Sequence, residues 1–318
     1  MQNRGIIMEM LSSQFIRVVK KYYLLQMSQK DIAVSEELST ATISRMLKRA
    51  VDNHYVTFHL HLPVMSQYEL ELEIKSKYQL EQVTVVNADI DSPEVIGRDV
   101  SAAVVPFLNQ ALKPGDILGI PWGTTMDTIA SNLIPKAIPD LRIVSLHGSV
   151  TCNASSSGAE SVIRRFAENY HALGYTLPVP SRVGNSETAQ VLMRDPNVRN
   201  MMDLIERTTV LMFSVGRLSP DSVLIKGGYF TEEEYQSMLE EGYVGDICSR
   251  HYLADGSYRD GELYNRIMAI GLDTILQKRI RIGVVMDKRK ALALKGALAG
   301  HYITHLFMDE FTARALLE

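Results

Sequence analysis

The sequence predicts an α/β protein with a small helical head and a larger body built on a parallel sheet. At 318 residues the chain is too long for one small module and fits two domains or one large one. Its first 60 residues are basic, with eight Lys/Arg and five Asp/Glu. The remainder is acidic, with 25 Lys/Arg and 32 Asp/Glu. Beyond residue 82, short apolar runs alternate with amphipathic stretches, as in strands and helices around a parallel sheet.

The composition excludes several classes of protein. A hydrophobic content of 46% with 22% charged residues is that of a soluble globular protein, and no apolar run is long enough to span a membrane. Glu9 and the polar Ser12 and Ser13 argue against a signal peptide. Two cysteines, Cys152 and Cys248, fit a reducing cytoplasm better than a disulfide scaffold or a cysteine metal site. We therefore expect a cytoplasmic protein with no metal, cofactor or membrane partner.

Three helices and one strand are expected in the head. Apolar residues at three- and four-residue spacing predict the first and third helices, and Ser28 followed by Asp31 predicts an N-cap before the second. High β propensity after the third helix predicts a strand or small wing. The expected elements are a helix over 11–27, a short helix after residue 28, a helix from 39 or 40 to about 53, and a strand over 55–60.

The third helix of the head has two different faces. Ile43, Leu47 and Ala50 lie on one side, whereas hydroxyl and basic side chains occupy the other. The second and third helices of the head therefore have the layout of a helix-turn-helix, whose second helix is apolar on one face and polar on the other. In such a unit, hydroxyl groups and an arginine guanidinium contact base edges, and lysines neutralise phosphates. The alternative is a solvated face of an ordinary three-helix cluster. The candidate DNA-contacting residues, including those at the two helix starts, are Ser28, Gln29, Ser39, Thr40, Thr42, Ser44, Arg45, Lys48 and Arg49.

Strands and helices alternate through the body. The expected strands are 83–86, 117–120, 143–146, 209–215, 282–285 and 302–307. The expected helices between and after them are 94–111, 124–132, 159–170, 196–206, 287–298 and 309–317. With a connecting helix near 66–80, the predicted domains are 1–62, a linker helix at 63–81, and 82–318. A parallel sheet of this kind binds ligands at the carboxyl ends of its strands.

The clearest candidate for a binding site follows the strand at 117–120. Trp122, Gly123, Thr124 and Thr125 lead directly from this strand into a helix. Because the first N–H groups of a helix lack intrahelical partners and carry the positive end of its dipole, this turn is suited to hold a phosphate. The segment is neither a Walker loop nor a GxGxxG motif, so it gives little support to nucleotide binding. The alternative is a plain turn capped by Thr124.

Several further motifs occur in one order along nearly the whole chain. They are Tyr22-Tyr23, Met27 to Ala33, Thr42 to Ala50, 113–130, Leu146-His147-Gly148, Gly227-Gly228-Tyr229, Val244 to Arg250, Lys290-Ala291 and Asp309 to Leu316. Together these motifs resemble those of the SorC-type family of bacterial transcription regulators. The segment Val244 to Arg250 is similar to the family motif "GDICGRF", whose first glycine falls at Gly245. Three positions of the head depart from the family pattern: Glu36 replaces an apolar residue, Glu37 replaces a glycine, and Thr40 replaces a frequent arginine.

The resemblance implies a winged helix-turn-helix domain followed by an effector domain with the fold of ribose-5-phosphate isomerase and glucosamine-6-phosphate deaminase. It implies that a phosphorylated sugar binds this domain and alters operator DNA binding by a tetramer. Gly123, Thr124 and Thr125 would hold the phosphate, and Lys290 would supply a cation. The remaining residues assigned to effector binding are Trp122 at the pocket border, His147 and Gly148 at the next strand end, and Asp246 as an acceptor from sugar hydroxyls.

Each of these assignments has an alternative. Trp122 would then be a packing residue, Asp246 a turn cap, and Lys290 a solvated side chain beside Lys288 and Arg289. For the whole chain, the leading hypothesis is a transcription regulator that is not an enzyme. One alternative is a sugar-phosphate isomerase or deaminase that carries a DNA-binding domain, although no acid/base pair is identifiable. Another is a structural DNA-binding protein with a vestigial pocket.

Overall fold

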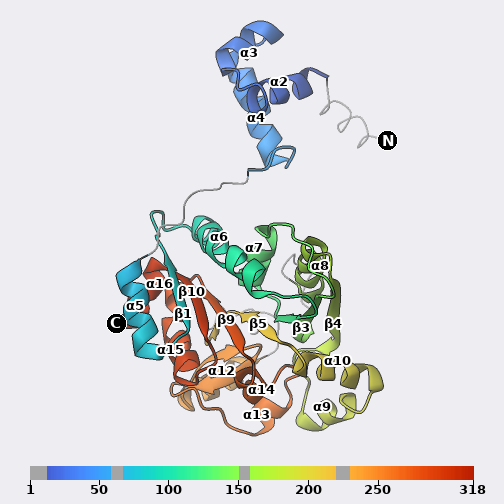
Figure 1. Ribbon diagram of the computed structural model, residues 1–318, viewed down its shortest axis with the longest axis vertical. Coiled ribbons are helices and arrows are strands. Elements are labelled where there is room, and N and C mark those ends of the chain that lie inside the picture. The colour runs from blue at the N-terminus through green and yellow to red at the C-terminus, as the bar shows by residue number, and fades with distance from the viewer. Residues whose placement is uncertain (1–12, 59–66, 150–157, 220–229) are drawn as a thin grey trace. The chain divides into compact units, whose positions relative to one another are not determined.

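The computed structural model describes residues 13–58, 67–149, 158–219 and 230–318 (Figure 1). It divides into two compact units, Met1–Leu62 and Pro63–Glu318. The first unit is helical, and the second contains a seven-stranded parallel sheet. The predicted α/β class is therefore confirmed. Among the described helices, none combines the length and the apolar character that a membrane crossing needs.

The described part of the N-terminal unit contains three helices, as predicted. They are α2 (Ser13–Tyr23), α3 (Gln29–Glu36) and α4 (Thr40–Asp52). The predicted cap begins α3, since the Ser28 hydroxyl accepts from the Asp31 amide. Ser39, which was expected only as a possible start of the third helix, caps α4, since its hydroxyl accepts from the Thr42 amide. Apolar residues of all three helices meet in one small core, which consists of Val18, Ile32, Ala33, Ile43 and Leu47.

The predicted wing strand is wrong for residues 55–58, which form no strand. The amides of Tyr55 and Val56 both donate to the carbonyl of Ala50, so they close the end of α4 and are not available to a strand partner. The rings of Tyr55 and Phe58 pack against Phe15 and Tyr23, respectively, at centroid distances of 6.0 and 5.8 Å. The aromatic residues that suggested a strand therefore cover the helices. Positions 59 and 60 lie outside the described residues.

Glu36, at a family position that is usually apolar, is buried and paired with two cations of α2. The Arg17 guanidinium donates to its carboxylate at 2.8 and 3.1 Å, and the Lys21 ammonium donates at 2.6 Å. These hydrogen bonds lower the pKa of Glu36 to about 2. The local structure thus accommodates the substitution through charge pairing between α2 and α3.

This pairing makes the N-terminal unit sensitive to acid. The folded pKa of Glu36, about 2, lies below its ordinary value of 4.5, so the unfolded chain binds the proton first. We expect protection factors of α3 and α4 amides to be constant above pH 4.5 and to fall as the pH drops from 4.5 towards 2. Hydrogen exchange in the full chain measures this effect, and Glu36→Gln should remove this component of it. Identical pH profiles for the two proteins would contradict the assignment.

Glu37, at a family position that is usually glycine, ends α3 in the left-handed conformation, with φ 55° and ψ 41°. Its amide donates to the carbonyls of Ala33 and Val34, and the Leu38 amide also donates to Ala33. This is the turn that normally favours glycine at a helix end. The sequence therefore retains the turn of the helix-turn-helix layout at a conformational cost.

Glu37→Gly should stabilise the N-terminal unit by about 0.5–1 kcal/mol, because glycine adopts this conformation without a steric penalty. Exchange of the α3 and α4 amides should slow by about two- to fivefold. Val34→Gly is the matched control, since this exposed residue lies within the helix, where glycine costs about 1 kcal/mol. Unchanged or faster exchange in Glu37→Gly would show that the turn carries no strain.

The sheet of the second unit has the order β1-β10-β9-β5-β2-β3-β4, with all neighbours parallel. The strands are β1 (Gln82–Val86), β2 (Ile117–Ile120), β3 (Arg142–Ser149), β4 (Leu173–Pro180), β5 (Val210–Phe213), β9 (Ile280–Val285) and β10 (His305–Asp309). Six of these were predicted, although β10 begins three residues later than expected. The edge strand β4 was not predicted, because Gly174, Pro178 and Pro180 interrupt its pattern.

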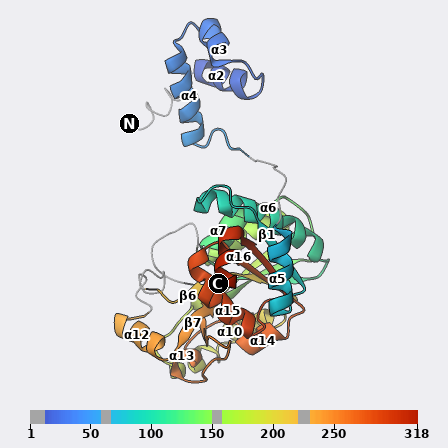
Figure 2. The same cartoon turned by 90° about the vertical axis from the view of Figure 1, so that its left-hand side faces the viewer.

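Helices cover both faces of the sheet, and each face has its own apolar core (Figure 1). One face packs against α6 (Pro93–Ala111), α7 (Thr124–Ser131) and α8 (Ala159–Tyr170). The other packs against α5 (Tyr68–Tyr78), α10 (Pro196–Glu206), α15 (Ala291–Ala299) and α16 (Glu310–Leu317). The helix that was expected to connect the domains, α5, lies beside α16 at the β1 edge and buries Ile74 (Figure 2).

A small antiparallel sheet was not predicted. It comprises β6 (Gly216–Arg217), β7 (Tyr243–Ile247) and β8 (Arg250–Leu253). The short helices α9 (Ser186–Leu192), α12 (Glu232–Glu240), α13 (Glu262–Asn265) and α14 (Leu272–Leu276) were also not predicted. The expected helix at 287–298 is divided into a 3-10 turn, η1 (Lys288–Lys290), and α15.

The strand order reverses beside β2. From β2 the chain proceeds through β3 to β4 on one side, and it then continues with β5, β9 and β10 on the other. Loops that leave β2 and β5 therefore diverge at the carboxyl ends of these strands. In open parallel sheets such a switch point is where ligands bind.

Candidate functional site

A cavity of about 320 Å³ lies at this switch point. It receives residues that follow the carboxyl ends of β2, β5 and β9 and one residue near the carboxyl end of β3, His147, and the small sheet contributes a further wall. Its lining comprises Pro121, Trp122, Gly123, Thr124, Thr125, Met126, His147, Ser214, Val215, Gly216, Arg217, Ser219, Asp246, Cys248, Ser249, Arg289 and Lys290. Most of the residues that were predicted to bind an effector therefore meet in one place, although they come from four parts of the chain.

The start of α7 forms one wall of this cavity. Gly123 precedes the helix with φ 133°, a conformation that a residue with a side chain rarely adopts, and it makes no side-chain cap. Thr124 and Thr125 are the first two helical residues and line the cavity. Because the first amides of a helix lack intrahelical acceptors, this wall presents N–H groups, two hydroxyls and the positive end of the helix dipole.

Trp122 both lines the cavity and is fixed by hydrogen bonding. Its indole N–H donates to the carbonyl of Gly148 at 3.0 Å, and its ring lies 4.9 Å from that of His147. Gly148 is the one predicted effector residue that is not part of the cavity lining. A Cβ atom on Gly148 would overlap the backbone of Val179 and Pro180, so this glycine allows β3 and β4 to approach closely.

His147 is buried and does not contribute a positive charge. Burial lowers its pKa to about 3, so the imidazole is neutral at physiological pH. Its Nδ1 atom has no hydrogen-bond partner among the residues that the structure describes. Cys248 is also buried, and burial raises the pKa of its thiol, so this side chain is an uncharged part of the wall.

Lys290 is the central cation of the site. Its ammonium donates to the Ser214 hydroxyl at 3.2 Å, and Ser214 directly follows β5. Burial lowers the pKa of Lys290, whereas Asp287 and Asp246 act in the opposite direction. Its neighbour Lys288, by contrast, has a side chain that is 57% exposed. The alternative that Lys290 is solvated like its neighbours is therefore wrong.

Two arginines of the lining were missed by the sequence analysis. Arg217 lies in the two-residue strand β6, which has too short a pattern to be recognised. Arg289 precedes Lys290 and forms a two-pronged ion pair with Asp287, at 2.9 and 2.8 Å. Only the folded chain brings these side chains to the turn after β2 and to His147 of β3.

Asp246 supplies a carboxylate in the lining from strand β7. It accepts from the Ser249 amide at 2.9 Å, so it caps the turn after β7, as the alternative stated, and it also lines the cavity. Gly216 of β6 pairs with Asp246 across the small sheet, and a Cβ atom at position 216 would overlap the Asp246 carboxylate. Glycine at position 216 thus makes room for Asp246 to face the cavity.

The charges of this lining favour an anionic ligand. Three cationic side chains and a helix N-terminus line the cavity with a single carboxylate. Within the described ranges, no group of three His, Cys, Asp or Glu side chains could hold a metal ion. The motif Gly227-Gly228-Tyr229 and Cys152 lie outside the described residues. The geometry is therefore that of a pocket for a small anion-bearing molecule.

In the N-terminal unit, α4 presents the predicted polar face to solvent. Thr40, Ser44, Arg45, Lys48 and Arg49 are exposed, whereas Thr42 is half-buried. The hydroxyls of Ser28 and Ser39 serve as helix caps, and the Ser39 hydroxyl also lies 2.8 Å from that of Thr42. Gln29 is half-buried at the start of α3. The exposed surface of α4 thus combines cationic side chains with hydroxyls.

A three-helix unit with a basic helix, followed by an α/β unit with an anion-suited cavity, is the organisation of a ligand-responsive regulator. The family model described as "Putative sugar-binding domain" matches residues 63–318. The chain therefore belongs to this sugar-binding family, the SorC-type transcription regulators that its motifs resemble.

Individual relatives agree with this family. The chain is similar to the deoxyribonucleoside regulator of Bacillus subtilis, with 30% identity over 302 residues that cover 95% of this chain and 96% of the relative. Among solved structures, it is similar to a domain of a possible sugar-binding transcriptional regulator from Arthrobacter aurescens TC1, with 28% identity and a TM-score of 0.73. The match covers 81% of this chain and 100% of that domain. The full-length sorbitol operon regulator SorC of Klebsiella pneumoniae shares the fold, with 23% identity and a TM-score of 0.73. This match covers 96% of this chain and 98% of SorC.

Proposed function

We propose that this protein is a cytoplasmic transcription regulator whose affinity for operator DNA changes when a phosphorylated sugar occupies the cavity. One observation carries the proposal: the partly buried Lys290 ammonium lines the same cavity as the N-terminus of α7. Together they suit the phosphoryl group, since a helix N-terminus and an ammonium both stabilise negative charge. The names of the relatives favour a regulator over the isomerase or deaminase alternative.

The cavity also suits the sugar part of such a ligand. Asp246 is an acceptor for sugar hydroxyls, and Ser214 combines donor and acceptor beside Lys290. Trp122 and Val215 add apolar surface to the lining. Polar groups that fix orientation, combined with apolar surface, are typical of pockets that bind one small molecule.

The N-terminal unit suits DNA as a helix-turn-helix. In this proposal α4 enters the major groove, where Arg45 and the hydroxyls of Thr40, Thr42 and Ser44 reach base edges. Lys48 and Arg49 contact phosphates. Further contacts to the DNA backbone come from the starts of α3 and α4, where Ser28, Gln29 and Ser39 lie. A homotetramer, as the family resemblance implies, would bind a palindromic or repeated operator.

The two sites are coupled by linkage. A ligand that binds one tetramer geometry more tightly shifts the population towards it, and DNA affinity changes by the same free energy, commonly about 1–3 kcal/mol. The coupling is reciprocal, so operator DNA must change the affinity for the sugar phosphate by an equal factor.

A thermal-shift panel tests the effector part of the proposal. The panel contains 2-deoxyribose 5-phosphate and sorbitol 6-phosphate, chosen because two relatives are named a deoxyribonucleoside regulator and a sorbitol operon regulator. Ribose 5-phosphate and glucose 6-phosphate are added as further sugar phosphates, and inorganic phosphate and free ribose serve as controls. A ligand at 100 times its dissociation constant should stabilise the protein by about 2.7 kcal/mol. At least one sugar phosphate should do so, and free ribose should not. No stabilisation by any member of the panel would contradict the proposal.

A further inference from the structure

The turn between β7 and β8 is strained where it meets the cavity. Ile247 pairs with Arg250, so Cys248 and Ser249 form a two-residue hairpin turn. Both have positive φ, 52° and 64°, as in the type I′ turn that ordinarily uses Asn-Gly or Gly-Gly. Neither residue is a glycine, and Ser249 stands where the family motif GDICGRF has one. Strain of this kind persists where the surrounding structure holds it, often at functional sites.

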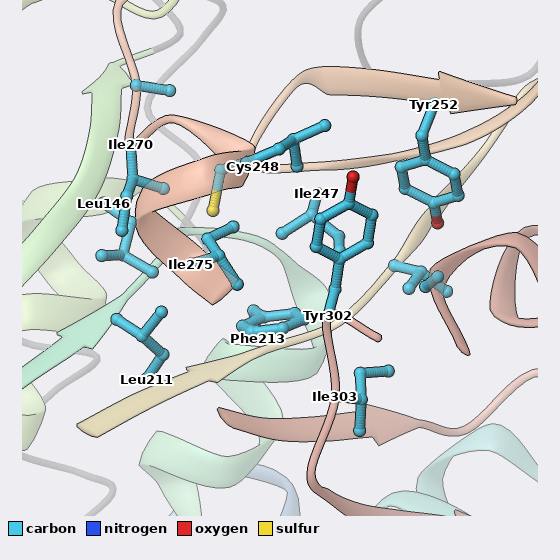
Figure 3. Close-up of a cluster of buried hydrophobic side chains, with 14 of the residues drawn as sticks. Leu146, Leu211, Phe213, Ile247, Cys248, Tyr252, Ile270, Ile275, Tyr302 and Ile303 are labelled. Atoms are coloured by element: carbon cyan, nitrogen blue, oxygen red, sulfur yellow. The ribbon is translucent and has the colours of Figure 1, made fainter. Parts of the chain in front are cut away.

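The two residues of this turn have different surroundings. Cys248 is buried, and Figure 3 shows it among buried side chains such as Ile275 and Leu146, so it is part of the apolar core. Like Cys248, Ser249 lines the cavity, but it is not part of the apolar core cluster. Its hydroxyl has no hydrogen-bond partner in the described part of the chain, although the residue is 95% buried. A hydroxyl in this position is available to a ligand.

The position of the Ser249 hydroxyl also indicates which part of a ligand it contacts. The Ser249 amide is bound to Asp246 at 2.9 Å, so the hydroxyl lies in the same turn as a carboxylate. A carboxylate repels a phosphoryl group, which instead finds its partners at α7 and Lys290. The neighbourhood of Asp246 and Ser249 is thus suited to uncharged oxygen atoms. A carboxylate acceptor with an adjacent hydroxyl can bind one hydroxyl that donates and one oxygen that accepts.

We propose that Ser249 is a specificity-determining residue that hydrogen-bonds a hydroxyl or carbonyl oxygen of the sugar chain, beside Asp246. This inference rests on the proposed function. It adds a residue that recognises the sugar part of the ligand, whereas α7 and Lys290 bind the phosphate. It explains why a strained position carries serine: glycine would relax the turn but would leave this contact unmade.

The proposal predicts effects of opposite sign on stability and binding. Ser249→Gly should raise the melting temperature of the ligand-free protein by about 2–4 °C, because it relieves the positive φ. The same substitution should lower the affinity for a sugar phosphate by about 3–10-fold, the contribution of one neutral hydrogen bond. The ligand for this comparison is any of the four panel sugar phosphates that the wild type binds. Ser249→Ala keeps the strain, so it should weaken binding equally with a melting temperature close to that of the wild type.

Calorimetric titration of the full chain with those sugar phosphates and with inorganic phosphate provides the test. Inorganic phosphate should bind the wild type and both Ser249 variants alike, and the exposed control Ser237→Ala should change nothing. Equal sugar-phosphate affinity in Ser249→Ala and the wild type would overturn this inference and leave the proposed function intact. Weakened binding of inorganic phosphate by Ser249→Ala would also overturn it, since Ser249 would then contact the phosphoryl group. A wild type that binds none of the sugar phosphates would contradict both.

Discussion

Replacing Lys290 with methionine is expected to weaken sugar-phosphate binding by about 10–100-fold, the contribution of one charge-assisted hydrogen bond. The ammonium is partly buried and burial lowers its pKa, so it gains more from an anion than an exposed lysine does. For the same reason, methionine should leave the ligand-free protein as stable as the wild type, or more stable. Thermal-shift titration with the four sugar phosphates measures both effects in one experiment.

Lys288 provides a matched control for this substitution. It lies in the same 3-10 turn, but its side chain is 57% exposed and 3.7 Å from Asp91. Lys288→Met should therefore retain the affinity of the wild type, whereas Thr125→Val, at the start of α7, should lose affinity as Lys290→Met does. A normal ligand response in Lys290→Met would exclude this lysine from the site. Operator binding without ligand should be unaffected in all three variants.

Arg45→Ala should weaken specific DNA binding by about 1–3 kcal/mol, or about 5–150-fold, if its guanidinium reads a base. The side chain is exposed on α4, and its Nε donates only to the Ala41 carbonyl of its own helix, at 3.3 Å. Its loss should therefore leave the fold intact. Binding to DNA selected from a random library by the full-length protein measures the effect.

The control for Arg45→Ala is Arg98→Ala, which removes an arginine that is half-exposed and paired with Glu94 on α6. It changes the net charge equally and should leave DNA affinity unchanged. Lys48→Ala should instead weaken binding uniformly across sequences and reduce its salt dependence by about one unit of slope. Operator binding by Arg45→Ala at the level of the wild type would remove its proposed role.

The fold was predictable from the sequence because its signals are local. Buried parallel strands such as β2 and β5 are continuous apolar runs, and a cap such as Ser28 marks the start of its helix directly. The wing failed for a non-local reason, since the aromatic side chains of Tyr55 and Phe58 pack on helices. The edge strand β4 was missed because glycine and prolines hide its pattern.

The candidate site was predictable only in part, for the same reason. The turn at Trp122 to Thr125 is contiguous, and strand, turn and helix start can be recognised together. Arg217 and Ser214 approach Lys290 only because β5 and β9 are neighbours in the sheet, and the small sheet was not foreseen at all. Family motifs located Asp246 and Lys290 where pattern alone left alternatives open. The positive φ of Ser249 has no signature in the sequence.

The most direct test of the account is the affinity of the full-length protein for its selected DNA, measured with and without a saturating sugar phosphate from the panel. A regulator with coupled sites should change its DNA affinity by about 5–150-fold, in either direction, which corresponds to a coupling free energy of about 1–3 kcal/mol. The change should vanish in Lys290→Met at the same ligand concentration. Equal DNA affinity with and without a sugar phosphate that is shown to be bound would contradict the central claim.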